Sequence, residues 1–183
     1  MKKRFLILLA AVAVAAIAAC EKEDTSEWGK SEALVRKYGD FDGSAIPAFV
    51  TRGVLIAEKE IGLENRRVYY GPSTDSYDDD LCGIKSPSQY VFFESGIEWS
   101  CRSFPDFMDC AVHAWEYDTA ARAFRLRHES GYEWRLVVEA FMPDEEMLIL
   151  DDGVYRSFMR LHSDQATVDR YMETYGPLAE AQE

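Results

Sequence analysis

The sequence predicts a mainly β protein whose strands follow one another in an antiparallel meander, with a short helix before the sheet and another after it. The main observation is a series of short runs rich in β-branched and aromatic residues, at 89–94, 97–102, 110–117, 123–127, 132–141, 147–150 and 154–161. Turn-forming residues separate these runs about every eight to twelve residues, as in sandwiches and barrels. We therefore expect a barrel, closed or open, or a sandwich.

The run at 132–141 shows the clearest alternation of apolar and charged residues. One face carries Tyr132, Trp134, Leu136, Val138 and Ala140, and the other carries Glu133, Arg135 and Glu139. Successive side chains of a strand point to opposite faces, so this pattern predicts one buried face and one face in water.

The elements that flank the meander are predicted from capping and periodicity. We expect a short helix over 31–38, a strand over 49–61 and a short extended piece over 68–70. A closing helix begins at Ser163 or Asp164, has apolar residues at helical spacing, and stops at Gly176-Pro177.

The composition limits the class of protein. The chain has 183 residues, enough for one domain, and 48% of them are hydrophobic, too many for a disordered chain. Its 33 acidic residues exceed its 20 basic ones, which gives a net charge of −13. This negative charge repels phosphate backbones, so we expect no nucleic-acid partner.

The first twenty residues have the organisation of a secretory signal. Lys2, Lys3 and Arg4 precede an uncharged apolar stretch from Phe5 to Ile17, which is shorter than the about 20 residues that a transmembrane helix needs. An uncleaved anchor is the alternative.

Ile17-Ala18-Ala19-Cys20 resembles the lipobox of bacterial lipoproteins. The resemblance implies cleavage before Cys20 and lipid attachment to its thiol, and several acyl chains hold a protein firmly on a membrane. We therefore predict a signal peptide at 1–19, a tether at 20–30, a single β domain at 31–176 and a disordered tail at 177–183.

The residues that follow Cys20 bear on location within the cell envelope. Glu21 departs from the Asp of the inner-membrane retention pattern of enteric lipoproteins. Lys22-Glu23-Asp24 is similar to the acidic export tag of surface lipoproteins in the Bacteroidetes, although a polar tether would read the same way. We expect lipid anchoring at the outer membrane, facing the periplasm or the cell surface.

Four motifs in the meander resemble the lipocalin-like domains of Bacteroidetes lipoproteins. They are an F-x-x-x-G turn at Phe92–Gly96, a strand with a central Trp at His113–Asp118, a step at Asp144–Leu150, and a last strand with an Arg at Tyr155–Leu161. The resemblance covers less than half of the chain and implies a lipocalin-like barrel.

The sequence carries no recognisable catalytic, cofactor or metal motif. His113, His128 and His162 share no ligand spacing, and we interpret them as surface or strand residues. Asp75, Asp78, Asp79 and Asp80 crowd one loop but lack the EF-hand pattern, so a solvated acidic loop is the main interpretation and a cation site the alternative. We expect no catalytic residues, no cofactor and no metal.

With Cys20 lipidated, three cysteines remain, which predicts one disulfide and one free thiol in an exported protein. Cys101–Cys110 would join adjacent strands, and Cys82–Cys101 and Cys82–Cys110 are the alternatives.

The aromatic residues of the meander are the remaining candidates for a site. Trp99, Trp115, Trp134 and Tyr132 could line a ligand cavity, and they could equally fill a solid core. The leading hypothesis is a non-catalytic binding protein for a small apolar ligand or an envelope component. The alternatives are an interaction subunit that acts through its outer surface and, as a third choice, an enzyme.

Overall fold

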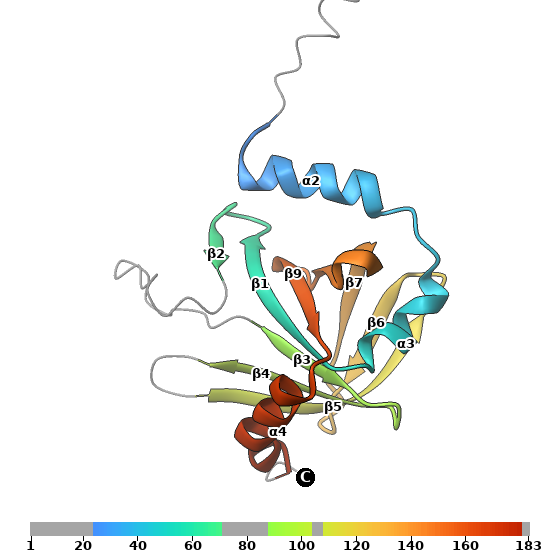
Figure 1. The fold of residues 1–183 in the computed structure, drawn as a ribbon, viewed down its shortest axis with the longest axis vertical. Coiled ribbons are helices and arrows are strands. Elements are labelled where there is room, and N and C mark those ends of the chain that lie inside the picture. The colour runs from blue at the N-terminus through green and yellow to red at the C-terminus, as the bar shows by residue number, and fades with distance from the viewer. Residues whose placement is uncertain (1–23, 71–87, 104–107, 181–183) are drawn as a thin grey trace, which may run out of the picture.

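The chain folds into a closed antiparallel β-barrel in a computed structural model that describes residues 24–70, 88–103 and 108–180 (Figure 1). The strands are β1 (Val54–Gly62), β2 (Val68–Tyr70), β3 (Gln89–Phe92), β4 (Ile97–Ser103), β5 (Met108–Asp118), β6 (Ala123–Arg127), β7 (Glu133–Met142), β8 (Met147–Asp151) and β9 (Tyr155–His162). Strand β9 pairs with β1 and so closes a ring of eight strands. The short strand β2 pairs with β1 alone and is not part of the ring. The mainly β prediction is confirmed, with the barrel in its closed form.

Two β-bulges decide which side chains enter the barrel. The pairing of β1 with β9 shifts between Ala57 and Lys59, so the inward face of β1 passes from Ala57 to Glu60. A second bulge lies in β7 between Val138 and Ala140. Because of the first bulge, a carboxylate enters the interior where regular alternation would place a lysine.

The end of the barrel that carries the turns at 93–96, 119–122 and 143–146 is filled with apolar side chains, and we call it the closed half. Its buried core includes Leu55, Phe92, Phe124, Leu126, Leu136, Leu148 and Met159. The short helix α3 (Ile46–Val50), which follows the 3₁₀ turn η1 (Gly43–Ala45), adds Ile46, Phe49 and Val50 to this core.

The predicted strand over 49–61 was wrong at its start, because Phe49 and Val50 belong to α3. Pro47 lies in the first turn of this helix, where its fixed φ suits a helix. Phe49 also packs edge-on against Phe141, with 5.0 Å between the ring centroids. Burial in the closed half therefore outweighs the strand propensity of these residues.

Helix α2 (Glu27–Tyr38) packs on the outer face of the barrel, with Trp28, Leu34 and Val35 against an apolar cluster on β1, β7, β8 and β9. The helix begins at Glu27 rather than Ser31, so residues 27–30 are helical rather than part of a tether. Ser26 caps it by accepting a hydrogen bond from the Gly29 amide at 3.1 Å.

A buried arginine holds α2 in place. Arg156 of β9, only 5% exposed, binds both carboxylate oxygens of Glu139 at 2.5 and 2.8 Å and also donates to Glu32 at 2.5 Å. Its guanidinium lies 4.3 Å from the centre of the Trp28 ring. The bidentate ion pair with Glu139 fixes the guanidinium, and the cation–π contact ties Trp28 to it. These contacts explain why residues 27–30, predicted as part of the tether, are helical.

Helix α4 (Gln165–Glu180) packs against the opposite part of the outer surface, over β1, β3 and β5 (Figure 1). It continues through Pro177 instead of ending at Gly176, so the predicted disordered tail is helical as far as Glu180. The fixed φ of a proline is itself a helical value. Within the described part of the chain, none of the helices combines the length and apolarity needed to cross a membrane.

Candidate functional site

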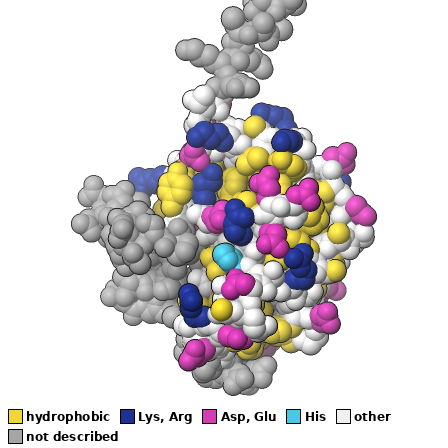
Figure 2. Space-filling model, in the orientation of Figure 1, with side chains coloured by type: hydrophobic (Ala, Val, Ile, Leu, Met, Phe, Trp, Pro, Cys, Tyr) yellow, Lys and Arg dark blue, Asp and Glu magenta, His cyan; other side chains and the backbone are white. Residues whose placement is uncertain are grey.

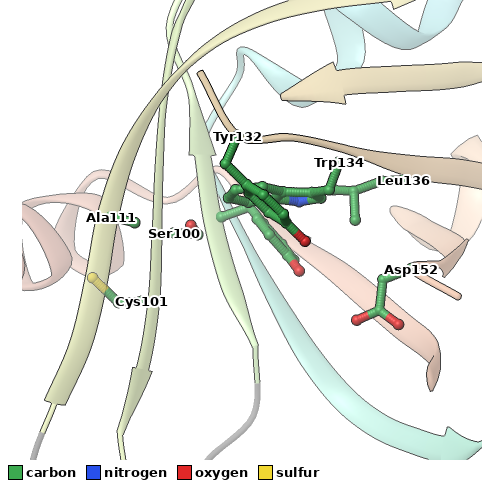
Figure 3. Close-up of a pocket in the computed structure, with 8 residues that line it drawn as sticks. Ser100, Cys101, Ala111, Tyr132, Trp134, Leu136 and Asp152 are labelled. Atoms are coloured by element: carbon green, nitrogen blue, oxygen red, sulfur yellow. The ribbon is translucent and has the colours of Figure 1, made fainter. Parts of the chain in front are cut away.

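A cavity of about 400 Å³ lies inside the other end of the barrel, which carries the turns at 63–67, 128–132 and 152–154; we call this end the open half. The described residues around the cavity are Tyr90, Ser100, Cys101, Ala111, Tyr132, Trp134, Leu136 and Asp152. Figure 3 shows Tyr132, Trp134 and Leu136 on one wall, with Ser100 and Ala111 on strands across from them. The volume is in the range of small-molecule sites.

The structure separates the four aromatic residues that the sequence singles out. Trp134 and Tyr132 line the cavity, with 5.6 Å between their ring centroids. Trp115 packs in the closed half against Phe92, and its indole N–H donates to the Phe93 carbonyl at 2.9 Å. Trp99 lies on the outer face beside Gly176 of α4. Along β4, Trp99 alternates with the inward-facing Glu98 and Ser100, so its side chain points to the outer face.

Below the lining residues, Glu98 and His113 face each other across β4 and β5. His113 Nδ1 lies 2.6 Å from Glu98 Oε2, and both side chains are completely buried. The His113 ring also packs edge-on against Trp134, with 4.0 Å between centroids. The pair thus supports one wall of the cavity.

Burial decides the protonation of this pair. It raises the pKa of Glu98 well above its usual value, and the neighbouring Ser100 hydroxyl opposes this effect only in part. Burial, helped by nearby His128, lowers the pKa of His113 to about 4. Both pKa shifts favour the uncharged pair, in which the carboxyl of Glu98 donates to His113 Nδ1. His113 Nε2 is buried and has no hydrogen-bond partner among the described residues.

A second polar group enters the open half from β1. Glu60 is 1% exposed and accepts hydrogen bonds from the hydroxyls of Ser88 at 2.7 Å and Ser157 at 3.0 Å. The open half is therefore polar inside as well as aromatic.

Sequence reasoning missed Glu60, Glu98 and His113. Glu98 and His113 could have been predicted to point inward, because each is next in its strand to an outward-facing residue, Trp99 or Val112. Glu60 could not be found this way, because the bulge in β1 reverses the parity there.

The structure describes two of the four cysteines and none of the crowded loop aspartates. Cys101 and Cys110, directly opposite each other on β4 and β5, form a disulfide, and in Figure 3 the Cys101 sulfur points away from the cavity. No cluster of three or more metal-ligand side chains occurs among residues 24–70, 88–103 and 108–180. Cys82 and the aspartates at 75, 78, 79 and 80 lie outside these ranges, as does Cys20.

On the outer surface, the face shown in Figure 2 carries acidic and basic side chains interspersed with apolar ones. The large hydrophobic residues most exposed in the described chain are Tyr70, Tyr132 and Val154. Two of these three sit on turns of the open half, and Tyr132 belongs to the cavity itself.

Fold and site together define a closed eight-stranded antiparallel barrel with a small, partly aromatic cavity that opens to solvent at one end. No protein-family model matches the chain, and no curated protein matches its sequence significantly. Function must therefore be argued from the cavity and the sequence motifs.

Proposed function

We propose that this protein is a non-catalytic, lipid-anchored binding protein of the cell envelope that holds a small, largely apolar molecule in the open half of the barrel. The observation that carries the proposal is the cavity of about 400 Å³ in a closed barrel whose other half is solidly packed. Eight-stranded barrels have room inside for side chains or for one small ligand.

The lining supports a ligand with apolar surface. Tyr132 is 65% exposed although its ring stacks beside Trp134 and borders the cavity. An aromatic ring left in water at the mouth of a cavity gains free energy when a bound molecule covers it, at roughly 25 cal/mol per Å² of apolar surface. The surface alternative, an interaction subunit, has weaker support because the exposed apolar residues gather at this same end.

The cellular address rests on the sequence. The resemblance of Ile17-Ala18-Ala19-Cys20 to a lipobox supports lipidation of Cys20, and Lys22-Glu23-Asp24 supports transport to the outer membrane of a Bacteroidetes cell. Mass spectrometry of protein from its native membrane should find acyl chains on an N-terminal Cys20. A Cys20→Ser variant should be recovered without acyl chains, and an unmodified wild-type Cys20 would contradict the anchor.

The cavity is tested by filling it. Ala111 lines the cavity, whereas Ala114 lies three residues further along β5, exposed on the outer face. We expect Ala111→Phe to abolish binding of the neutral fluorescent probe N-phenyl-1-naphthylamine and Ala114→Phe to leave binding unchanged. Probe binding that is equal in both variants would place the ligand elsewhere and contradict the proposal.

A further inference from the structure

The walls of the cavity differ in chemistry. Three aromatic rings, those of Tyr90, Tyr132 and Trp134, line it, while aliphatic side chains contribute only Ala111 and Leu136 among the described lining residues. Figure 3 shows the Tyr132 and Trp134 rings gathered on one side. Flat aromatic walls favour flat aromatic ligands, because stacked or edge-on rings gain about 0.5–1.5 kcal/mol beyond the area that they bury.

The aromatic wall is held in a fixed orientation. The buried ring of His113 packs edge-on against Trp134, at 75° and 4.0 Å, and is itself held by Glu98. Because the pair supports the indole from behind, Trp134 presents a preorganised surface, and a ligand spends little free energy on ordering it.

The depth of the cavity argues against a long acyl chain. Leu136 borders the cavity and also belongs to the core of the closed half, where Phe124 and Leu126 are completely buried. A chain that extended along the barrel axis would have to displace these side chains. The space that remains suits a compact molecule.

A hydrogen-bonding wall faces the rings. Ser100 lines the cavity from β4, two residues from buried Glu98 on the same face of the strand. The Ser100 hydroxyl can accept a hydrogen bond from a molecule in the cavity. A ligand with a hydrogen-bonding substituent would therefore fit this wall better than a pure hydrocarbon.

We propose that the ligand is a compact planar aromatic compound with one hydrogen-bonding substituent, such as a phenol, naphthol or indole. The ring stacks on Trp134 and Tyr132, and the substituent meets the Ser100 wall. This inference rests on the proposed function, because it narrows the ligand class of the same cavity.

The test compares three probes by isothermal titration calorimetry on the purified β domain with its leader replaced by Met: 2-naphthol, naphthalene and decan-1-ol. We expect 2-naphthol to bind most tightly. Trp134→Leu should weaken 2-naphthol about tenfold and leave decan-1-ol within about twofold, while Trp134→Phe retains most of the affinity. Trp115→Phe, in the closed half, is the matched control and should change neither.

A second variant separates the polar part of the inference. Ser100→Ala should weaken 2-naphthol and leave naphthalene unchanged, and it remains informative if Trp134→Leu fails to fold. Tighter binding of decan-1-ol than of 2-naphthol would overturn the aromatic inference and leave the proposed function standing. Absence of binding by all three probes, together with identical behaviour of Ala111→Phe and wild type, would overturn both.

Discussion

The two halves of the barrel are built from the same strands but have opposite interiors. The closed half is filled by apolar side chains from seven strands and α3, with Phe92 and Phe124 at its centre. The open half contains Glu60, Glu98, His113 and Ser157, which hydrogen-bond in small groups and leave a cavity above them. Close packing of the first half supplies stability, and the imperfect filling of the second leaves room for the ligand that we propose.

The largest effect should follow from damage to the closed half. Phe124 is completely buried and lies 4.6 Å from Phe92, centroid to centroid. We expect Phe124→Ala to lower the free energy of unfolding by about 3–5 kcal/mol, because it removes apolar contacts and leaves a void. Urea denaturation measures this loss. A loss below about 1 kcal/mol would show that the closed half is not the main source of stability.

The stability of the open half should depend more on the disulfide than that of the closed half does. The Cys101–Cys110 disulfide joins β4 and β5 across a sequence separation of nine residues. Closing so short a loop stabilises by about 2.6 kcal/mol through the entropy of the unfolded chain. The Cys101→Ser, Cys110→Ser double variant should lose this amount in urea denaturation. Faster hydrogen exchange should appear first in β4 and β5, and uniform acceleration over both halves would contradict the comparison.

The buried pair of Glu98 and His113 in the open half should make the stability of the protein depend on pH. Above pH 4.5, the usual pKa of Glu98, the unfolded chain loses a proton that the folded protein keeps, so rising pH favours unfolding. Below pH 6.5, the usual pKa of His113, the unfolded chain gains a proton that the folded protein does not take up until about pH 4. The two effects oppose each other between pH 4.5 and 6.5.

Above pH 6.5 only the Glu98 effect remains, so the pair should lower the free energy of unfolding by about 1.4 kcal/mol per pH unit until the raised pKa of Glu98 is reached. Glu98→Gln keeps a donor for His113 Nδ1 and cannot ionise. The difference between wild type and this variant in urea denaturation should therefore slope with pH from 6.5 upward. A flat difference would mean that Glu98 is ionised in the folded protein.

The smallest effect on stability belongs to the mouth of the cavity. Tyr132 is 65% exposed, so Tyr132→Ser should change the free energy of unfolding by less than about 0.5 kcal/mol. The same variant should weaken binding of 2-naphthol, because it removes one ring of the aromatic wall. Unchanged affinity in calorimetry would remove Tyr132 from the site.

Much of the fold could be predicted from the sequence, because local signals and tertiary structure agree over the meander. The predicted run at 123–127 matches β6, and that at 97–102 lies within β4. The errors lie where tertiary contacts override local preference. Phe49 and Val50 enter a helix to fill the closed half, and Trp28 becomes helical against Arg156, which lies far away in the sequence.

The candidate site was predictable only in part. Trp134 and Tyr132 could be selected because the alternation of 132–141 puts them on the buried face. The roles of Trp99 and Trp115 could not be separated, since one-dimensional alternation does not tell which half of the barrel, or which side of the wall, a residue occupies. Nothing in the sequence distinguishes His113 from an ordinary strand residue, because its partner Glu98 lies on a different strand.

The sequence by itself determined the acidic charge, the order of strands and turns, and the face of each regular strand, because these depend on composition or on neighbours along the chain. Only the tertiary structure decided that the barrel closes through β1 and β9, that a bulge turns Glu60 inward, and that Glu98 meets His113 beneath Trp134. The physical reason is that closure, bulges and desolvation depend on contacts between residues distant in sequence.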